Sequence, residues 1–249
     1  MSFLSIKELL DKEVVKRDTL DELSLDKPDP LMIARKYKDE YISLICALFA
    51  YGNANQIVKF LSSLDFSLLN SDEESIRRSL SKRYYRFQNS NDVSEFFITL
   101  KKAKKVSFLK SVFLMGYQKS GVVTEGLREL ITFLYDINPY RSKGYEFLIG
   151  KIPQKNFKSP YKRWNMYLRW MVRKDSLDMG LWEDVDKKDL LIPLDTHTFN
   201  ISLKLGLLKR KTYDFKAVVE LTETLKRFDP FDPVKYDFAL YRIGQEKIL

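Results

Sequence analysis

The chain has 249 residues, and 43 Lys and Arg against 34 Asp and Glu give it a net charge of +9 at neutral pH. A composition that is 45% hydrophobic and 14% aromatic can fill the core of one or two domains, which excludes intrinsically disordered and fibrous proteins. The positive surplus favours a polyanionic partner.

Cysteine and histidine usage excludes several kinds of metal site. The single cysteine, Cys46, cannot form an internal disulfide, and together with the single histidine, His197, it provides too few ligands for a His and Cys zinc site. A four-cysteine iron–sulfur cluster is excluded for the same reason. We therefore expect no metal ion and no cofactor.

No stretch of the sequence is apolar enough to enter a membrane. The longest apolar run, Tyr41–Tyr51, is far shorter than the about 20 residues that span a bilayer. No secretory signal is recognisable either. We expect a cytoplasmic protein without membrane contact.

Apolar residues recur at helical spacing along nearly the whole chain, and no segment shows sustained alternation, so the pattern predicts an all-α protein. Pro28, Asp29 and Pro30 separate a first helical stretch from a second, which ends by Gly52. Further helices are predicted at Asp92–Ala103, Val106–Gln118, Thr124–Tyr135, Tyr161–Lys174, Thr196–Leu207, Phe215–Arg227 and Pro233–Lys247.

Basic residues are concentrated in three parts of the sequence, at 101–105, 155–163 and 209–211. Each of these clusters is suited to contact phosphate. For any one cluster taken alone, a solvated helix face or loop is the simpler interpretation. The overall charge raises the expectation of nucleic-acid binding without identifying the surface.

The helix predicted at Tyr161–Lys174 has two distinct faces. One face is polar and largely cationic, and its members follow one another at spacings of three and four: Lys162, Asn165, Met166, Arg169 and Arg173. The other face is apolar and contains Trp164, Leu168 and Met171. We therefore expect one buried stripe and one cationic stripe.

Lys162 lies in the first turn of this helix, just after Pro160. The partial positive charge of a helix N-terminus disfavours a protonated ammonium there, and the neighbouring Arg163 acts in the same direction. A lysine that spends time unprotonated can attack a carbon electrophile and form a Schiff base. From position alone, a phosphate-binding or solvent-exposed lysine is the simpler alternative.

Asp195 directly precedes the helix predicted at Thr196–Leu207 and is expected to cap it by accepting the Thr198 amide. Capping alone is a sufficient explanation for an aspartate here. A carboxylate held by backbone amides also stays ionised and oriented, which suits it to stabilise a developing cation. His197 is expected to have a structural or DNA-facing role, since no second histidine exists to share a metal ion.

Two blocks of the sequence resemble a known family. LIPLDTHTFNISLKLGLLKR at 191–210 resembles the aspartate-containing segment of the helix-hairpin-helix DNA glycosylase superfamily, and KRWNMYLRWMV at 162–172 resembles its lysine-bearing helix. The interval of 195 − 162 = 33 residues is closest to the archaeal GO, or 8-oxoguanine, branch. The resemblance implies that Lys162 is the nucleophile and Asp195 the catalytic aspartate.

The resemblance is strong over 158–210, continues to Gly244 and is weaker upstream, at 29–52 and in YYRFQN at 84–89. The chain departs from the family in the hairpin, where the usual Gly-x-Gly turn is replaced by Lys158, Ser159, Pro160 and Tyr161. It also lacks the four-cysteine cluster of endonuclease III, as the GO branch does.

The resemblance implies two helical subdomains around a DNA-binding cleft, with the chain leaving one subdomain and returning to it. We expect 1–29 and 190–249 to form one subdomain and 30–189 the other, so that Lys162 and Asp195 face each other across the cleft. The implied partner is double-stranded DNA containing a damaged base, bound by a monomer and therefore associated with the nucleoid. A base inside a duplex is inaccessible, so the target nucleotide must swing out.

The implied activity is that of a bifunctional glycosylase and lyase in base excision repair. Lys162 attacks the sugar C1′ as an oxidised base, 8-oxoguanine by resemblance, leaves, and Asp195 stabilises the positive charge on the sugar. The resulting imine permits β-elimination, which cuts the strand.

The base pocket and the DNA contacts are harder to locate in the sequence. We predict Met166, Asp232 and Tyr236 as pocket walls, although Asp232 before Pro233 is more simply a helix cap and Tyr236 a core residue. Gly52, Asn53 and Asn55 are predicted to fill the space vacated by the flipped base. The predicted phosphate contacts are Lys158, Arg163, His197 and Lys209.

Two other functional classes remain open at this point. A monofunctional glycosylase, in which Asp195 activates water, tolerates loss of Lys162. A non-catalytic helical DNA-binding module keeps the basic surface but has no use for a helix-start lysine opposite a carboxylate.

Overall fold

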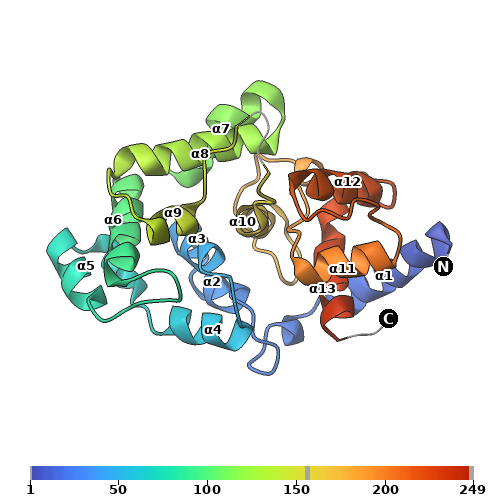
Figure 1. Cartoon of the computed structure of the whole chain (residues 1–249), viewed down its shortest axis with the longest axis horizontal. Coiled ribbons are helices and arrows are strands. Elements are labelled where there is room, and N and C mark those ends of the chain that lie inside the picture. The colour runs from blue at the N-terminus through green and yellow to red at the C-terminus, as the bar shows by residue number, and fades with distance from the viewer. Residues whose placement is uncertain (1, 155–157, 247–249) are drawn as a thin grey trace. The chain divides into compact units, whose positions relative to one another are not determined.

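A computed structural model describes residues 2–154 and 158–246, and within these ranges the chain contains 13 α-helices and no β-strand (Figure 1). The all-α prediction is confirmed. Lys155, part of one basic cluster, and Lys247, the end of the last predicted helix, lie outside the described residues.

The chain forms two compact units. Unit 1 comprises Met1–Lys27 and Asn156–Leu249, and unit 2 comprises Pro28–Lys155. The chain thus leaves unit 1 once and returns to it once. The return lies well before the expected boundary at 189/190, so the described residues between 158 and 189 belong to unit 1 and not to the expected 30–189 subdomain.

Unit 2 is built from eight α-helices in its described part, in the order α2 (Leu31–Tyr37), α3 (Glu40–Leu48), α4 (Ala54–Ser62), α5 (Glu73–Leu80), α6 (Ser90–Val106), α7 (Leu109–Ser120), α8 (Val123–Ile137) and α9 (Lys143–Ile149). Helices α7 and α8 pack closely as a hairpin (Figure 1). Glycine makes this approach possible, because a Cβ on Gly126 would lie 2.5 Å from the Phe113 ring.

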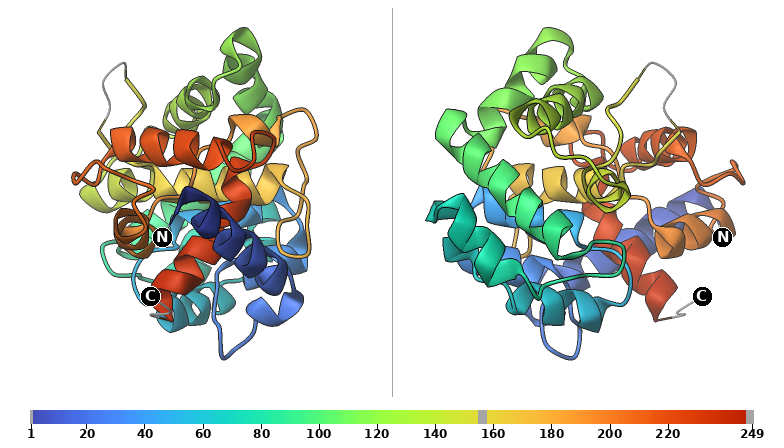
Figure 2. Two further views of the ribbon diagram at one scale, coloured as in Figure 1. Left: turned by 90° about the vertical axis from the view of Figure 1, so that its right-hand side faces the viewer. Right: turned by 60° about the vertical axis from the view of Figure 1, so that its left-hand side comes forward.

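Unit 1 contains the other five α-helices of the described residues: α1 (Phe3–Arg17), α10 (Lys162–Val172), α11 (Thr196–Lys204), α12 (Phe215–Lys226) and α13 (Asp237–Gln245). Helix α13 packs against both α1 and α11, and Figure 2 shows α1 beside it. A short 3-10 helix, Pro233–Tyr236, precedes α13.

Most helices predicted from the sequence are present with shifted ends, and the differences have local causes. The second predicted stretch is two helices, because Lys38 adopts a left-handed conformation (φ 48°) and Asp39 caps a new helix by accepting the amides of Tyr41 and Ile42. The last predicted helix begins four residues late, since Pro233–Tyr236 is 3-10 helical. Helices α4, α5 and α9 were not predicted.

No helix in the described part of the chain combines the length and apolar character needed to cross a membrane.

Candidate functional site

The turn before α10 has a backbone conformation that is unusual for its residues. Tyr161 is the N-cap of the helix and adopts left-handed angles (φ 48°, ψ 35°), which glycine accepts readily and an aromatic residue rarely does. The amide of Phe215 donates to the Lys158 carbonyl at 2.9 Å, which ties the turn to the start of α12. The turn before α10, which has no glycine, therefore still contains a glycine-like conformation at Tyr161.

Lys162 is the first residue of α10, as the sequence predicts, and its side chain is half-buried. Its Nζ lies 3.5 Å from the Sδ of Met166, one turn further along the helix. Met166 is buried, with 7% of its surface exposed. The structure therefore brings together the predicted nucleophile and one predicted pocket wall.

Asp195 is the N-cap of α11, and the Thr198 amide donates to its Oδ1 at 2.8 Å, so the predicted cap is confirmed. The residue is half-buried. The Tyr213 hydroxyl donates to the Leu194 carbonyl at 2.7 Å and so fixes the backbone just before the cap. The carboxylate thus has a defined position at a helix start.

Asp237, the first residue of α13, connects the two predicted catalytic residues. Its carboxyl group is buried and receives a hydrogen bond from the Arg169 guanidinium. Burial raises the pKa of Asp237 to about 6; Asp195 adds to the rise, whereas Arg169 and Lys162 oppose it. Asp195 and Lys162 are therefore both close enough to Asp237 to influence its charge.

Lys162 and Asp195 consequently lie in the same unit. The expectation that they face each other from different subdomains assumed a boundary at 189/190, and the described residues place α10, α11 and α13 together in unit 1. The close packing of α11 on α13 is aided by Gly244, where a Cβ would lie 3.1 Å from the His197 carbonyl oxygen.

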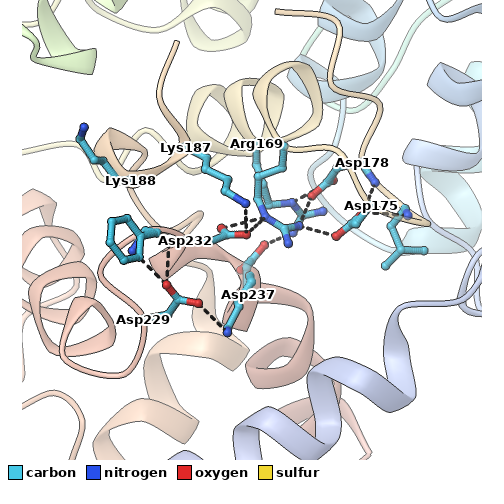
Figure 3. Close-up of polar contacts among 12 residues, drawn as sticks. Arg169, Asp175, Asp178, Lys187, Lys188, Asp229, Asp232 and Asp237 are labelled. Carbon is cyan, nitrogen blue, oxygen red and sulfur yellow. Dashed lines mark hydrogen bonds and ion pairs between the residues drawn. The ribbon is translucent and has the colours of Figure 1, made fainter. Parts of the chain in front are cut away.

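The far end of α10 is locked in a network of buried charges that we call the ion-pair cluster (Figure 3). It consists of Arg169, Arg173, Asp175, Asp178, Asp232 and Asp237. Arg169 donates to Asp178 at 3.2 Å through Nε and also contacts Asp237. Arg173 donates to Asp178 at 2.6 Å and to Asp232 at 2.9 Å. Burial raises the pKa of Asp178 even though both arginines oppose the rise.

The ion-pair cluster changes the interpretation of α10. Arg169 and Arg173 are only 4% and 9% exposed, so the predicted cationic stripe is not a solvent-facing surface. The predicted apolar stripe of Trp164, Leu168 and Met171 is buried as expected. Helix α10 is therefore covered on both faces along most of its length, and its buried arginines need the carboxylates to offset their desolvation.

Two predicted pocket residues have structural partners instead of free polar groups. The Asp232 carboxylate accepts from Arg173 and makes no capping hydrogen bond, so the simpler alternative of a helix cap is also not what the structure contains. The Tyr236 side chain is fully buried, and its hydroxyl donates to Asp11 of α1 at 2.8 Å. Both residues hold the start of α13 in place.

The predicted DNA-contacting residues occupy different surroundings. Lys158, His197 and Lys209 are exposed, whereas Arg163 is half-buried. The His197 ring packs edge-on against Tyr241, with ring centres 5.8 Å apart. In the basic cluster at 209–211, Arg210 is paired with Asp214 at 2.7 Å, so that cluster carries less free charge than its sequence indicates.

Asn53 belongs to unit 2, and Gly52 and Asn55 lie beside it. The Asn53 side chain is exposed and caps α4, accepting the Gln56 amide at 3.3 Å. A capping role is compatible with a DNA contact because the exposed amide group retains unused donors.

Sequence reasoning missed Asp237. A usable signal existed, because Arg169 lies seven residues after Lys162 on the same helix face, and a buried arginine requires a carboxylate partner. The segment 229–237 offers three aspartates, and the sequence alone does not decide which of them pairs with which arginine.

Among the described residues, no group of three or more His, Cys, Asp or Glu side chains is arranged to hold a metal ion.

Comparison with known proteins adds a family but no activity. Residues 29–246, most of the chain, match the model of a family described as a protein of unknown function (DUF2400). No curated protein and no solved structure matches the chain.

Proposed function

We propose that this protein, which belongs to the DUF2400 family, is a DNA glycosylase that excises an oxidised base and then cuts the strand as a lyase. The proposal includes a helix-hairpin-helix glycosylase fold, a monomeric protein and double-stranded DNA containing a damaged base as substrate. 8-Oxoguanine is the base that the sequence resemblance favours.

The observation that carries the proposal is the pair of helix-start residues that share one buried neighbour. Lys162 begins α10, Asp195 caps α11, and both act on the charge of Asp237 at the start of α13. A lysine and a carboxylate near a third group whose pKa is about 6 form a set that can exchange protons and stabilise positive charge. A purely DNA-binding module needs none of these features.

The sequence resemblance names no residue that removes the proton from Lys162, and we assign this role to Asp237. Lys162 must lose its ammonium proton before it attacks. With a pKa of about 6, the Asp237 carboxylate is ionised at neutral pH and is a stronger base than an ordinary aspartate, so we assign it as the acceptor of that proton. Arg169, bound to the same carboxyl group, keeps it in place during the transfer.

The chemistry then follows from Lys162 and Asp195. The free amine of Lys162 forms a bond to C1′ while the bond from C1′ to the damaged base breaks, and Asp195 stabilises the positive charge that develops on the sugar. Opening of the sugar ring with loss of a proton from nitrogen gives an imine. The imine acidifies the neighbouring carbon, so that β-elimination releases the phosphate on the 3′ side.

Borohydride trapping tests this function, because borohydride reduces an imine to a stable protein–DNA adduct. We expect the wild-type protein to form an adduct with duplex DNA carrying 8-oxoguanine and to nick it. Lys162→Gln should abolish both reactions, and Lys162→Arg should fail as well, since a guanidinium stays protonated. Lys158→Gln, four residues earlier in an exposed position, removes a predicted phosphate contact but not the Lys162 amine, so it should trap to the wild-type yield when the DNA is saturating.

Other outcomes assign the activity differently. Full trapping by Lys162→Gln with loss in Lys158→Gln moves the nucleophile to Lys158. Base release that persists without strand cleavage supports a monofunctional glycosylase in which Asp195 activates water. Absence of base release from every oxidised duplex removes the glycosylase assignment.

A further inference from the structure

The turn between α5 and α6 of unit 2 presents a dense group of charged and aromatic side chains. Lys82, Arg83, Tyr84, Arg86 and Phe87 are all exposed, and Tyr85 between them is buried. Tyr84 and Phe87 expose 74% and 59% of their surface. Single exposed aromatic side chains are ordinary, but several that lie together mark a candidate contact surface.

The backbone of this turn is fixed. The amides of Tyr85 and Gln88 each donate to the carbonyl of the other, at 3.0 and 2.9 Å. The Gln88 side chain donates to the Gly144 carbonyl at 2.8 Å, and the Tyr85 hydroxyl donates to the Tyr51 carbonyl at 2.8 Å. The exposed side chains are therefore presented from a rigid base.

The backbone of Arg86 adopts an unusual conformation although its side chain is exposed. Its φ of 51° is in the left-handed region, which is strained for a residue with a side chain. Gly52, at φ 104°, makes room for it, since a Cβ there would lie 2.7 Å from the Arg86 Nη1. The left-handed backbone of Arg86 and the missing side chain of Gly52 together determine where the Arg86 guanidinium lies.

That guanidinium lies against an aromatic platform, which consists of Tyr51, Phe87 and Phe147. The rings of Tyr51 and Phe87 are nearly parallel, at 6° with centres 6.1 Å apart, and Phe147 packs edge-on against both. The Arg86 guanidinium carbon is 5.9 Å from the Tyr51 ring centre and 5.6 Å from that of Phe87. Phe147 is 43% exposed, so the platform is open to solvent.

The cations of this turn are available to a partner. Within the described residues, Lys82, Arg83 and Arg86 make no ion pair, whereas Arg77 and Arg78 on the preceding helix are paired with Glu95 and Glu74. Unpaired cations beside exposed rings match a ligand that carries both phosphates and flat rings. A purely apolar protein partner would leave these three charges uncompensated.

We propose that the aromatic platform binds an unpaired base of single-stranded DNA by stacking, while Lys82 and Arg83 contact the adjacent phosphates. The choice of DNA over RNA rests on the proposed function. The stacking itself does not, because it involves no residue of the Lys162 site.

Fluorescence anisotropy with a labelled oligo-dT and an oligomer of equal length made of tetrahydrofuran abasic units, which cannot form an imine with a lysine, separates stacking from phosphate binding. We expect the wild-type protein to bind oligo-dT more tightly than the abasic oligomer. Phe87→Ala should weaken oligo-dT binding at least about fivefold, the loss of one stacked base, and leave the abasic oligomer unaffected. Phe108→Ala is the matched control, since Phe108 is 70% exposed in the same unit.

The cation contribution is tested in the same way. Arg86→Ala should weaken oligo-dT binding more than Lys105→Ala, which changes an exposed lysine on α6 outside this turn. Equal affinity of wild type for the two oligomers, or an unchanged Phe87→Ala, overturns the proposal, and tighter binding of oligo-rU with the same sensitivity to Phe87→Ala overturns the choice of DNA. This assay measures binding through residues of unit 2 and requires neither base release nor trapping, so a failed trapping experiment leaves its result intact.

Discussion

The two ends of α10 are built on opposite principles although they belong to one 11-residue helix. At the start, Lys162 is half-buried and its closest described polar contact is a thioether at 3.5 Å. At the other end, Arg169 and Arg173 are buried and bound to four aspartates. We call the Lys162 end the open end, because Lys162 makes no ion pair among the described residues. We call the end at Arg169 and Arg173 the anchored end, because ion pairs hold it.

Under the proposed function, this difference describes how Lys162 is positioned as a nucleophile. A nucleophile needs an approach route and freedom to lose a proton, so it cannot be buried in strong ion pairs. The helix that carries it must nevertheless stay in place, and the ion-pair cluster provides that anchoring two turns away. Asp237 links the two ends, because it accepts a hydrogen bond from Arg169 and the charge of Lys162 lowers its pKa.

Removing the anchor should have the largest effect. Arg173→Met removes the buried cation that Asp178 and Asp232 share and leaves them only Arg169 and the partly exposed Lys187, so we expect the free energy of unfolding to fall by about 3 kcal/mol. Urea denaturation measures this loss. Arg78→Met is the control, since the exposed Arg78–Glu74 pair contributes less than about 1 kcal/mol. A loss equal to that of the control would mean that the cluster does not hold α10.

Changing Asp195 should alter the open end without unfolding the protein. An asparagine still accepts the Thr198 amide, so the cap and the stability of Asp195→Asn should be close to wild type. The rate of 8-oxoguanine release in single-turnover assays should nevertheless fall about 10²–10³-fold, because the charge that stabilises the sugar cation is gone. Base release at the wild-type rate would leave Asp195 with a capping role alone.

The sequence predicts the open end of α10 better than the anchored end. Lys162 and Asp195 are located by local rules, since a proline before a helix and an aspartate at an N-cap depend on neighbours within four residues. The predicted helix starts at Thr196 and Phe215 are correct for the same reason.

The anchored end depends on contacts between residues far apart in sequence. Arg173 and Asp232 are 59 positions apart and Arg169 and Asp237 are 68 apart, and no helical period links them. Helix spacing alone therefore made the arginines look like a solvated stripe. The unit boundary was placed too late for the same reason, because these pairs commit α10 to the C-terminal part of the chain.

The titration of Asp237, which interacts with both ends of α10, should have a smaller effect on the free energy of unfolding. The pKa of Asp237 is about 6 in the folded protein, and its ordinary value is 3.8. Between these two pH values the folded state holds a proton that the unfolded chain has already released. This contribution stabilises the fold at low pH and is lost as the pH rises through about 6.

The comparison is made with Asp237→Asn, which keeps an oxygen acceptor for Arg169 but does not titrate. The difference in free energy of unfolding between wild type and variant should shift by roughly 1–3 kcal/mol in favour of wild type as the pH falls from about 7 to about 4. Wild-type trapping should decline below about pH 6, where protonated Asp237 cannot accept a proton, and the variant, which lacks this acceptor at every pH, should trap more slowly at neutral pH and show no such decline. If the free energies of unfolding of wild type and variant changed in parallel with pH, Asp237 would not titrate in this range.

The smallest expected effect concerns phosphate contact beside the open end. Binding of undamaged duplex should weaken steeply with salt, because each neutralised phosphate releases counterions. Lys158→Ala should reduce the slope of log K against log salt by about 1, the share of one phosphate. Lys12→Ala, an exposed lysine on α1, should leave the slope unchanged. A slope that responds to Lys12 and not to Lys158 would place the DNA on another face of unit 1 and separate the turn before α10 from phosphate binding.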